Sequence, residues 1–287
     1  MNRVIYSLYI DIPENQFYLR NPDTEKSTKT KTAFKNNYQK LKDSHIRYAN
    51  KIGVEYKLFE YDEKYKEYSN FFKENYPEIN EYSIVNFYKI HLLDEMANDY
   101  DEVLYLDFDV IPMTNENFFE VWDLSKGLTL YNNNDSVNSR NKPIHKILGH
   151  SDRSPTAKYY NCQAMLIDTG YSPENDVINT GIIGGTKEHI KQLGYFENFK
   201  NDLDLMTRLR LEDDGFYPEN IRMMFAYDNE TLFSYNLKVT NTPHQWFDKQ
   251  WHYFFDRTYF VPKITKFCHC INKEFDMAWD RYEKNNL

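Results

Sequence analysis

The sequence "YDEVLYLDFDVIP", residues 100–112, decides how the rest of the chain is interpreted. Its apolar run from Val103 to Leu106 predicts a buried β-strand that ends at two acids, Asp107 and Asp109. Side chains alternate along a strand, so the two carboxylates are expected on the same face. Two like charges at a partly buried edge repel each other, and a divalent cation such as Mg²⁺ or Mn²⁺ removes that repulsion. The pattern therefore predicts a metal site, although a solvated strand end with one capping Asp gives the same sequence.

Alternating strands and helices precede this stretch. Residues 3–10 and 54–59 are β-rich runs that predict strands, and residues 14–31 predict a long polar loop. Apolar residues recur at helical spacing from about 34 to 52 and from about 83 to 98, which predicts two helices. The β-α-β-α-β order predicts an α/β fold with a largely parallel sheet and helices on its faces. Ligands bind such sheets at the carboxyl ends of the strands, which is where the two acids lie.

The second half of the chain is less regular. Its predicted elements are strands at 127–131, 162–167, 177–185 and 261–270 and helices near 187–210 and 228–237, followed by a polar tail. The polar segment between the first two of these strands has many turn residues, and a loop of this length is usually functional or mobile. No repeat or Gly/Ser linker divides the sequence, so we expect a single domain over residues 1–287.

Composition and charge exclude several classes of function. The net charge is −9 and no dense basic run is present, which argues against nucleic acid as the main partner. No stretch approaches the roughly 18 apolar residues of a membrane span. Asp11 and Pro13 end the N-terminal apolar residues too early for a signal peptide. The three cysteines, Cys162, Cys268 and Cys270, are too few for a disulfide framework, which favours a reducing, cytoplasmic compartment.

The longer stretch "YKIHLLDEMANDYDEVLYLDFDVIP", residues 88–112, resembles the core signature of GT-A-fold nucleotide-sugar glycosyltransferases. It is most similar to the retaining, glycogenin-like and galactosyltransferase-like group, in which a helix with a basic residue precedes the strand and its Asp-x-Asp. Lys89 falls at that basic position, which implies a place beside the donor sugar and phosphates, and Phe108 is implied as a further donor contact. The family has a mixed, mainly parallel central sheet flanked by helices. The resemblance implies a nucleotide-binding half at about 1–112 and a donor-sugar and acceptor half at about 113–287.

Two stretches compete for the strand that lies beside the donor sugar in this family. "INTGIIGG", residues 178–185, resembles the family's Asn-x-Gly strand and implicates Asn179 and Gly181 in donor binding. Gly181 would permit close approach of the backbone, although a buried strand with a glycine bulge fits the same letters. "YYNCQAMLID", residues 159–168, is the weaker competitor, with Gln163 where Gly is expected.

A motif near the C-terminus supplies the third metal ligand. "FCHCINK", residues 267–273, resembles the family's His-containing motif, in which the His binds the metal and a following Lys binds the diphosphate. The resemblance therefore implies a metal site of Asp107, Asp109 and His269, with Lys273 on the diphosphate. The family's Gly and Lys-Pro-Trp are missing here. A zinc site made by the His and its two flanking cysteines is an alternative, but neighbours on a strand face opposite ways and no fourth ligand is evident.

The resemblance implies a metal-dependent glycosyltransferase that uses Mn²⁺ or Mg²⁺. It would move a sugar from a nucleotide-sugar donor, of the UDP-sugar type, to a hydroxyl of a glycan or another acceptor, with retention of configuration. Leu8, Tyr9 and Asp11, at the end of the first strand, would lie beside the base and ribose.

Other residues are implied to face the sugar and the acceptor. Asp228 and Glu230 would lie near the anomeric carbon together with Asn179, although both acids also suit the start of a helix. Residues 132–160 and the aromatic segment 246–260 are candidates for acceptor contacts. The aromatic rings would either stack on sugar faces or pack a C-terminal helix.

Competing functions use some of the same residues. A haloacid-dehalogenase-type phosphatase would use Asp107 as nucleophile and residues 212–215 as its late acid pair, but Ile111 and Pro112 depart from its pattern. A sugar nucleotidyltransferase needs a Gly-rich loop after its first strand, and residues 11–20 contain no Gly. A carbohydrate-binding module would explain the aromatic residues but not the paired acids.

Overall fold

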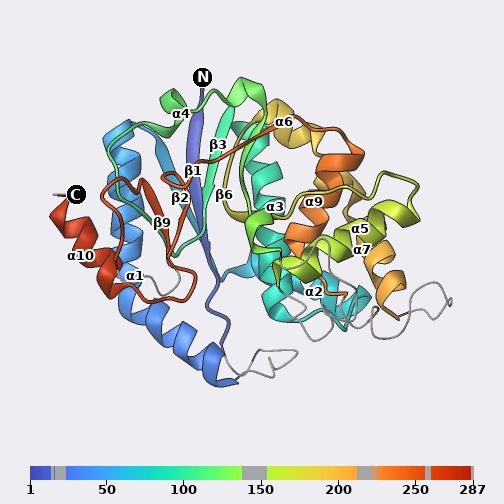
Figure 1. Cartoon of the computed structure of the whole chain (residues 1–287). Helices are drawn as coiled ribbons and strands as arrows, with labels where there is room; N and C mark the ends of the chain where they lie inside the picture. Colours follow the sequence, from blue (N-terminus) through green and yellow to red (C-terminus); the bar gives the residue numbers. More distant parts are fainter. Residues whose placement is uncertain are drawn as a thin grey trace.

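A six-stranded sheet lies at the centre of the computed structural model, which describes residues 1–13, 16, 24–137, 154–211, 222, 225–255 and 260–285 (Figure 1). The strand order is β2-β1-β3-β6-β5-β7, with β1 Arg3–Tyr9, β2 Glu55–Glu60, β3 Glu102–Leu106, β5 Leu128–Asn132, β6 Ile178–Thr186 and β7 His244–Trp246. Among these described strands, β1 is parallel to β2 and β3, and β5 is parallel to β7. Only β6 runs antiparallel to its neighbours in this sheet. The sheet is therefore mixed and mainly parallel, as expected.

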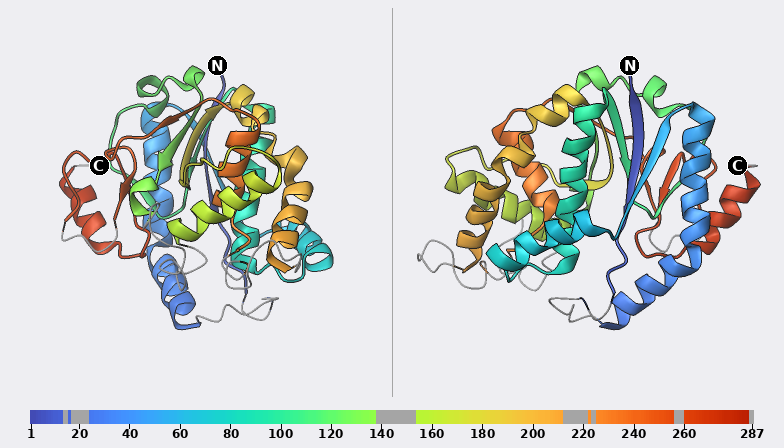
Figure 2. Two further views of the ribbon diagram at one scale, coloured as in Figure 1. Left: turned by 45° about the vertical axis from the view of Figure 1, so that its right-hand side comes forward. Right: turned by 180° about the vertical axis from the view of Figure 1, so that it is seen from behind.

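Helices cover both faces of the sheet (Figure 2). They are α1 Thr24–Ile52, α2 Glu63–Asn75, α3 Glu81–Asp99, α6 Lys187–Gln192, α7 Tyr195–Leu211 and α9 Asn229–Val239. In β1, Val4 and Tyr6 belong to a buried apolar cluster that includes Phe87 of α3. Ile5 between them belongs to a second cluster, with Tyr48 of α1. The alternation of side chains along the strand thus fixes the sheet between two helical layers.

A small second sheet brings the C-terminal part of the chain to the end of β3. Its order is β4-β9-β8, with β4 Val110–Pro112, β9 Phe267–His269 and β8 Tyr253–Phe254. β4 pairs antiparallel with β9 in a register that places Val110 opposite His269. Because β4 directly follows Asp109, this pairing places a late histidine beside the acids of the Asp-x-Asp.

Residues 162–167 form part of helix α5, Pro155–Asp168, so the predicted strand is wrong. Ser154 caps this helix, since its hydroxyl accepts a hydrogen bond from the backbone N–H of Ala157 at 3.1 Å, and Pro155 occupies the first turn. The buried residues Cys162, Met165 and Leu166 are spaced three and four apart. That spacing places them on one helical face, and α5 packs against α9.

Other element boundaries also differ from expectation. The predicted loop at 14–31 is wrong for its described C-terminal part, because α1 already begins at Thr24. That first part of α1 is rich in Lys and Thr and carries little apolar periodicity, so the pattern indicates a helix only from Phe34. Helix α2 and helix α10, Asp276–Lys284, were not predicted. Among the described helices, none combines the length and apolarity needed to cross a lipid bilayer.

Candidate active site

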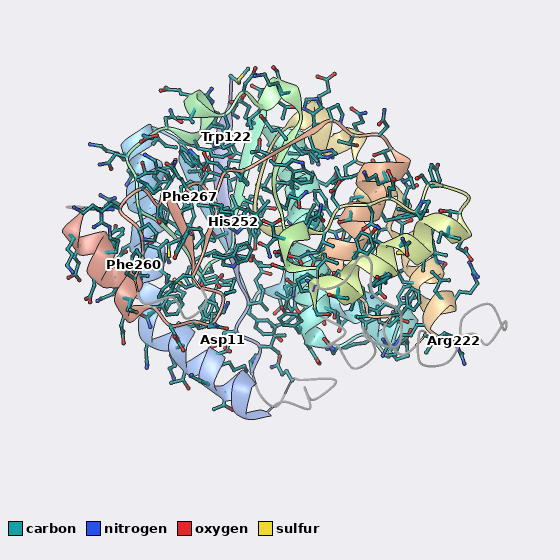
Figure 3. The ribbon with its side chains drawn as sticks, in the orientation of Figure 1. Asp11, Trp122, Arg222, His252, Phe260 and Phe267 are labelled. Atoms are coloured by element: carbon teal, nitrogen blue, oxygen red, sulfur yellow. The ribbon has the colours of Figure 1, made fainter. Side chains whose placement is uncertain are left out.

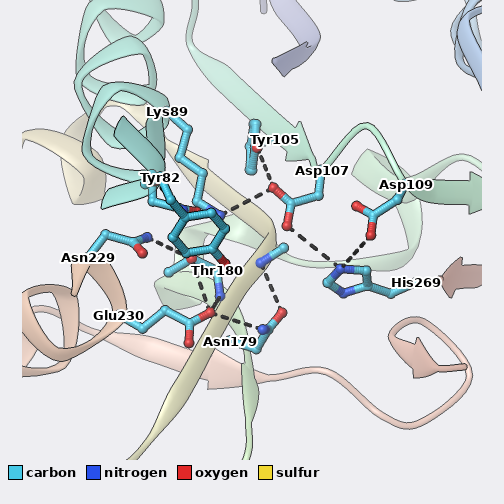
Figure 4. Close-up of polar contacts among 12 residues, drawn as sticks. Tyr82, Lys89, Tyr105, Asp107, Asp109, Asn179, Thr180, Asn229, Glu230 and His269 are labelled. Carbon is cyan, nitrogen blue, oxygen red and sulfur yellow. Dashed lines mark hydrogen bonds and ion pairs between the residues drawn. The ribbon is translucent and has the colours of Figure 1, made fainter. Parts of the chain in front are cut away.

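Asp107, Asp109 and His269 converge at the junction of the two sheets (Figure 4). The Nε2 atom of His269 lies 3.7 Å from Asp107 Oδ2 and 3.5 Å from Asp109 Oδ2. The acids lie in a tight turn between β3 and β4, in which the N–H of Val110 donates to the carbonyl of Asp107 at 2.9 Å. They therefore converge through a turn, and the expected alternation along a strand is not what aligns them.

These three side chains fit a divalent cation. One ligand atom from each lies within 4.8 Å of the other two. A cation with ligands at about 2.1 Å separates neighbouring ligands by about 3 Å and opposite ligands by about 4 Å, so only small movements are needed. Two carboxylates and an imidazole are donors that Mn²⁺ accepts, and Asp109 is only 3% exposed. A pair of adjacent carboxylates of which one is buried needs positive charge, which supports the predicted metal site.

Asp107 has two further partners besides His269. Lys89 Nζ of α3 donates to its Oδ1 atom at 3.2 Å, and the hydroxyl of Tyr105 donates to the same oxygen. Lys89 is only 4% exposed, so its ammonium group faces this site and is shielded from solvent. The predicted basic residue of the helix therefore lies at the Asp-x-Asp, and its contact with donor phosphates stays a prediction.

Lys273 neutralises the second acid. Its ammonium group donates to Asp109 Oδ2, and its backbone has a left-handed φ of 59°. Burial raises the pKa of Asp109, but the nearby charges of Lys273 and His269 outweigh burial and hold that pKa well below its usual range. The strained backbone at Lys273, in a short turn after β9, thus keeps the lysine ammonium group against Asp109.

Gly181 of β6 lies against the His269 ring. A Cβ atom at this position would lie 2.4 Å from His269 Cε1 and 2.8 Å from Asn179 Oδ1. The N–H of Gly181 donates to that Asn179 oxygen at 2.9 Å, and its carbonyl accepts from the N–H of Asp107 at 2.7 Å. A glycine is required here because the backbone approaches the His269 side chain, while the donor contacts that the resemblance implied for Asn179 and Gly181 stay a prediction.

A second charged cluster lies opposite the acid pair, at the start of α9. Glu230 Oε1 accepts from Asn179 Nδ2 at 2.9 Å and from the N–H of Thr180 at 2.9 Å. Lys158 of α5 pairs with the other oxygen of Glu230 and lies 3.4 Å from Asp228 Oδ1. Asp228 Oδ2 accepts from the N–H of the residue three positions on, so Asp228 caps α9 as well.

Burial and charge act in opposite directions in this cluster. Burial raises the pKa of Glu230, but Lys158 and Lys89 outweigh it, and the pKa is lowered. Burial lowers the pKa of Lys158, but Asp228 and Glu230 outweigh it and raise that pKa. Both the lysine and the glutamate are therefore charged at neutral pH, and each depends on the other for its charge.

The two clusters line opposite walls of one polar cavity of about 250 Å³. Of the predicted site residues, the cavity is lined by Lys89, Asp107, Asn179, Asp228, Glu230, His269 and Lys273. Lining residues that the sequence did not single out include Tyr82, Arg210, Tyr227, Asn229 and Lys158, the last of which falls within the acceptor candidates at 132–160. Charged and amide groups surround this space, which suits a ligand with phosphates at one end and hydroxyl groups at the other.

Comparison with known proteins gives the family. The sequence profile of glycosyl transferase family 8 matches residues 4–194, which is about two thirds of the chain. The chain belongs to glycosyl transferase family 8. This family 8 glycosyltransferase has the GT-A fold, and no curated protein matches it.

Two solved structures share the fold of the family 8 chain. The galactosyltransferase LgtC, solved with donor and acceptor sugar analogues, is 12% identical, with a TM-score of 0.51 over 99% of this chain and 94% of that chain. WbbM, a bifunctional glycosyltransferase solved without ligands, is 14% identical, with a TM-score of 0.51 over 99% of this chain and 49% of that chain. At such identities the likeness establishes the fold alone.

The predicted base and ribose contacts of this family 8 glycosyltransferase lie outside the cavity. Leu8 is buried, Asp11 is exposed 4.0 Å from the Lys31 ammonium, and Asp11 lies beyond the end of β1 (Figure 3). The ring of Tyr9 lies 5.0 Å from that of Phe108, which is buried. Their contacts with a nucleotide stay a prediction.

Three rings of the aromatic segment 246–260, those of Phe247, Trp251 and Phe255, are buried in the protein. Trp251 is 4% exposed and lies edge-on to Phe118 and Phe267, so it belongs to the apolar cluster beside α4, Phe118–Val121. Of the acceptor candidates at 132–160, residues 138–153 lie outside the described part of the chain, while Lys158 lines the cavity. The segment 246–260 contributes none of the cavity lining among described residues.

Two alternatives lose support. Membership of a glycosyltransferase family disfavours the phosphatase, in which Asp107 is a nucleophile. Within the described residues, the possible ligand group is the Asp-Asp-His set, and Cys268 and Cys270 lie instead in a buried apolar cluster. The family 8 chain therefore offers oxygen and imidazole ligands, and the zinc site is not supported.

Proposed function

We propose that this glycosyltransferase moves a sugar from a UDP-sugar-type donor to a hydroxyl acceptor, with a divalent cation such as Mn²⁺ and with retention of configuration. The observation that supports this most is the convergence of Asp107, Asp109 and His269, at a polar cavity lined by Asp107, His269 and the two lysines Lys89 and Lys273. The three cysteines are unbonded, which fits a reducing compartment, and we place the protein in the cytoplasm on that ground.

The donor diphosphate belongs at the acid pair in this proposal. Asp107, Asp109 and His269 would hold the cation, which supplies positive charge to the diphosphate as it leaves. Lys89 and Lys273 add two ammonium groups, each already within hydrogen-bond distance of an acid. When phosphate oxygens arrive, these ammonium groups can turn towards them and stabilise the negative charge that develops on bond cleavage.

The sugar belongs at the opposite wall, beside Asn179, Asp228 and Glu230. Both oxygens of Glu230 are occupied by donors, and Asp228 is shared between Lys158 and the helix cap. Carboxylates with their lone pairs engaged are poor nucleophiles but still oppose positive charge on a neighbouring anomeric carbon. The geometry therefore favours a same-face route to retention over a covalent glycosyl-enzyme.

The acceptor belongs at the mouth of the cavity. Tyr82 is 55% exposed and lines this cavity. An exposed ring at a polar cavity can stack on the apolar face of a sugar ring, which supports a glycan acceptor.

Thermal denaturation with UDP, GDP or CMP, each with and without Mn²⁺, tests the donor and cation together. We expect one nucleotide to raise the melting temperature only with Mn²⁺, and Asp109→Asn to abolish that rise. Asp43→Asn, at an exposed position of α1, is the matched control and should retain it. Equal stabilisation of D109N and the unaltered protein would contradict the metal assignment. Hydrolysis assays with a panel of nucleotide sugars would then identify the donor.

A further inference from the structure

A second buried histidine lies directly behind His269. We infer that His252 is a positioning residue that holds the His269 ring and keeps its proton on Nδ1, so that Nε2 faces the two aspartates as a free ligand. This inference rests on the metal site of the proposed function. It concerns a residue of the aromatic segment that the sequence suggested for acceptor binding.

The contact between the rings is direct. His252 Nε2 lies 3.0 Å from His269 Nδ1, while the other nitrogen of His269 faces the acids. An imidazole binds a cation only through a nitrogen without a proton, so a neutral His269 bound to a cation carries its proton on Nδ1. His252 Nε2 is then the acceptor of that proton's hydrogen bond. The reverse hydrogen bond would place the proton of neutral His269 on Nε2, where it blocks the cation.

His252 cannot move away from this position. It is fully buried and stacks on Phe254 at 4.7 Å with an interplanar angle of 11°. The ring of Tyr131 lies 4.7 Å away, and Phe247 lies edge-on at 6.1 Å. The aromatic cage therefore fixes the direction of His252 Nε2, which in turn fixes the rotation of the His269 ring.

Packing alone does not explain a histidine at this position. The Nδ1 atom of His252 is buried and has no hydrogen-bond partner among the described residues. An unpartnered polar atom in an aromatic cage destabilises the fold, and a phenylalanine of similar shape would avoid it. The contact with His269 is the interaction that a phenylalanine would lack.

Two substitutions separate the hydrogen bond from packing. His252→Phe keeps an aromatic ring and removes the acceptor, while His252→Gln keeps a carbonyl that can accept from His269. The dissociation constant for Mn²⁺ alone is measured from the electron paramagnetic resonance signal of free Mn²⁺. We expect H252F to raise this constant about 10- to 100-fold and H252Q to recover part of the loss. His91→Phe, at a half-buried histidine in another aromatic cluster, is the control and should bind Mn²⁺ as the unaltered protein does.

A direct observation of the proton completes the test and does not depend on any variant folding. Side-chain ¹⁵N spectra of the unaltered protein with Mg²⁺ report which nitrogen of His269 is protonated, and we expect Nδ1. An unchanged Mn²⁺ constant in H252F would overturn the inference but leave the metal site intact. A proton on Nε2 in the presence of Mg²⁺ would overturn the inference and would also remove His269 from the proposed ligands. No Mn²⁺ binding by the unaltered protein would instead overturn the proposed metal site, and the inference with it.

Discussion

Replacing Gly181 by Ala inserts one methyl group between strand β6 and His269, the third proposed metal ligand. The new Cβ would lie 2.4 Å from His269 Cε1 and 2.7 Å from its Nδ1. Ordinary carbon contacts begin near 3.5 Å, so the ring must retreat by roughly 1 Å. His252 lies 3.0 Å behind it, so little room is left for that movement. Metal–ligand distances tolerate only about 0.2 Å, and a displacement of this size removes the imidazole from the site.

Gly184 on the same strand provides the matched control. A Cβ there would lie 2.5 Å from Cζ of Phe118, a fully buried ring that does not line the cavity. Overpacking of either kind costs about 1–3 kcal/mol of unfolding free energy. Gly181→Ala and Gly184→Ala should therefore lose similar stability in urea denaturation, while only Gly181→Ala disturbs the proposed ligand His269.

The Mn²⁺ dissociation constant distinguishes the two variants. We expect Gly181→Ala to raise it at least about tenfold, as loss of ligand orientation does elsewhere, and Gly184→Ala to leave it unchanged. Both variants are first checked for folding by circular dichroism, so that binding is compared between folded proteins. If G181A binds Mn²⁺ as the unaltered protein does, or G184A weakens binding equally, the ligand assignment of His269 is refuted.

Three further predictions concern buried charge and backbone strain. Lys158→Met leaves Glu230 buried without its counter-charge, and urea denaturation should show a loss of about 3–5 kcal/mol that Lys158→Arg largely avoids. Burial raises the pKa of Asp202 to about 6 despite a hydrogen bond from Asn236, so the native state keeps a proton that the unfolded state releases near pH 4. The unfolding free energy should therefore fall by about 3 kcal/mol as pH rises through the window from about 4 to 6, and Asp202→Asn should remove that fall in urea denaturation at several pH values. Lys273→Gly relieves the positive φ that Lys273→Ala retains, so urea denaturation should find the glycine variant more stable by about 1 kcal/mol.

Local patterns predicted the first half of the fold well. The apolar run before Asp107 and the helical spacing around Lys89 are properties of neighbouring residues, and both are found as β3 and α3. The error at 162–167 shows the limit, because a short apolar run suits a strand or a buried helix equally. The cap signal of Ser154 followed by Pro155 was present in the sequence and would have favoured the helix.

The site was harder to predict than the fold, because its residues meet only through tertiary packing. His269 was found by resemblance and not by spacing, since its partner in β4 is more than 150 residues away along the chain. Lys158 was covered only by the broad acceptor segment 132–160 and was not singled out, because a lysine in a polar segment is ordinarily solvated. Lys158 becomes a site residue only because α5 packs on α9, which brings its ammonium group to Glu230.

The register of the small sheet connects the fold to the proposed chemistry. Val110 opposite His269 directs the histidine to the acids, and the alternation of β9 turns Cys268 to the other face, where Cys270 also lies in an apolar cluster. A slip of one residue would turn a thiol to the acids and bury the imidazole among aromatic rings. Both cysteines are fully buried, and the N–H of Cys270 donates to the carbonyl of Asp109 at 3.0 Å, which opposes such a slip. The cysteines that suggested a zinc site therefore act as small apolar residues that hold the neighbouring histidine in register.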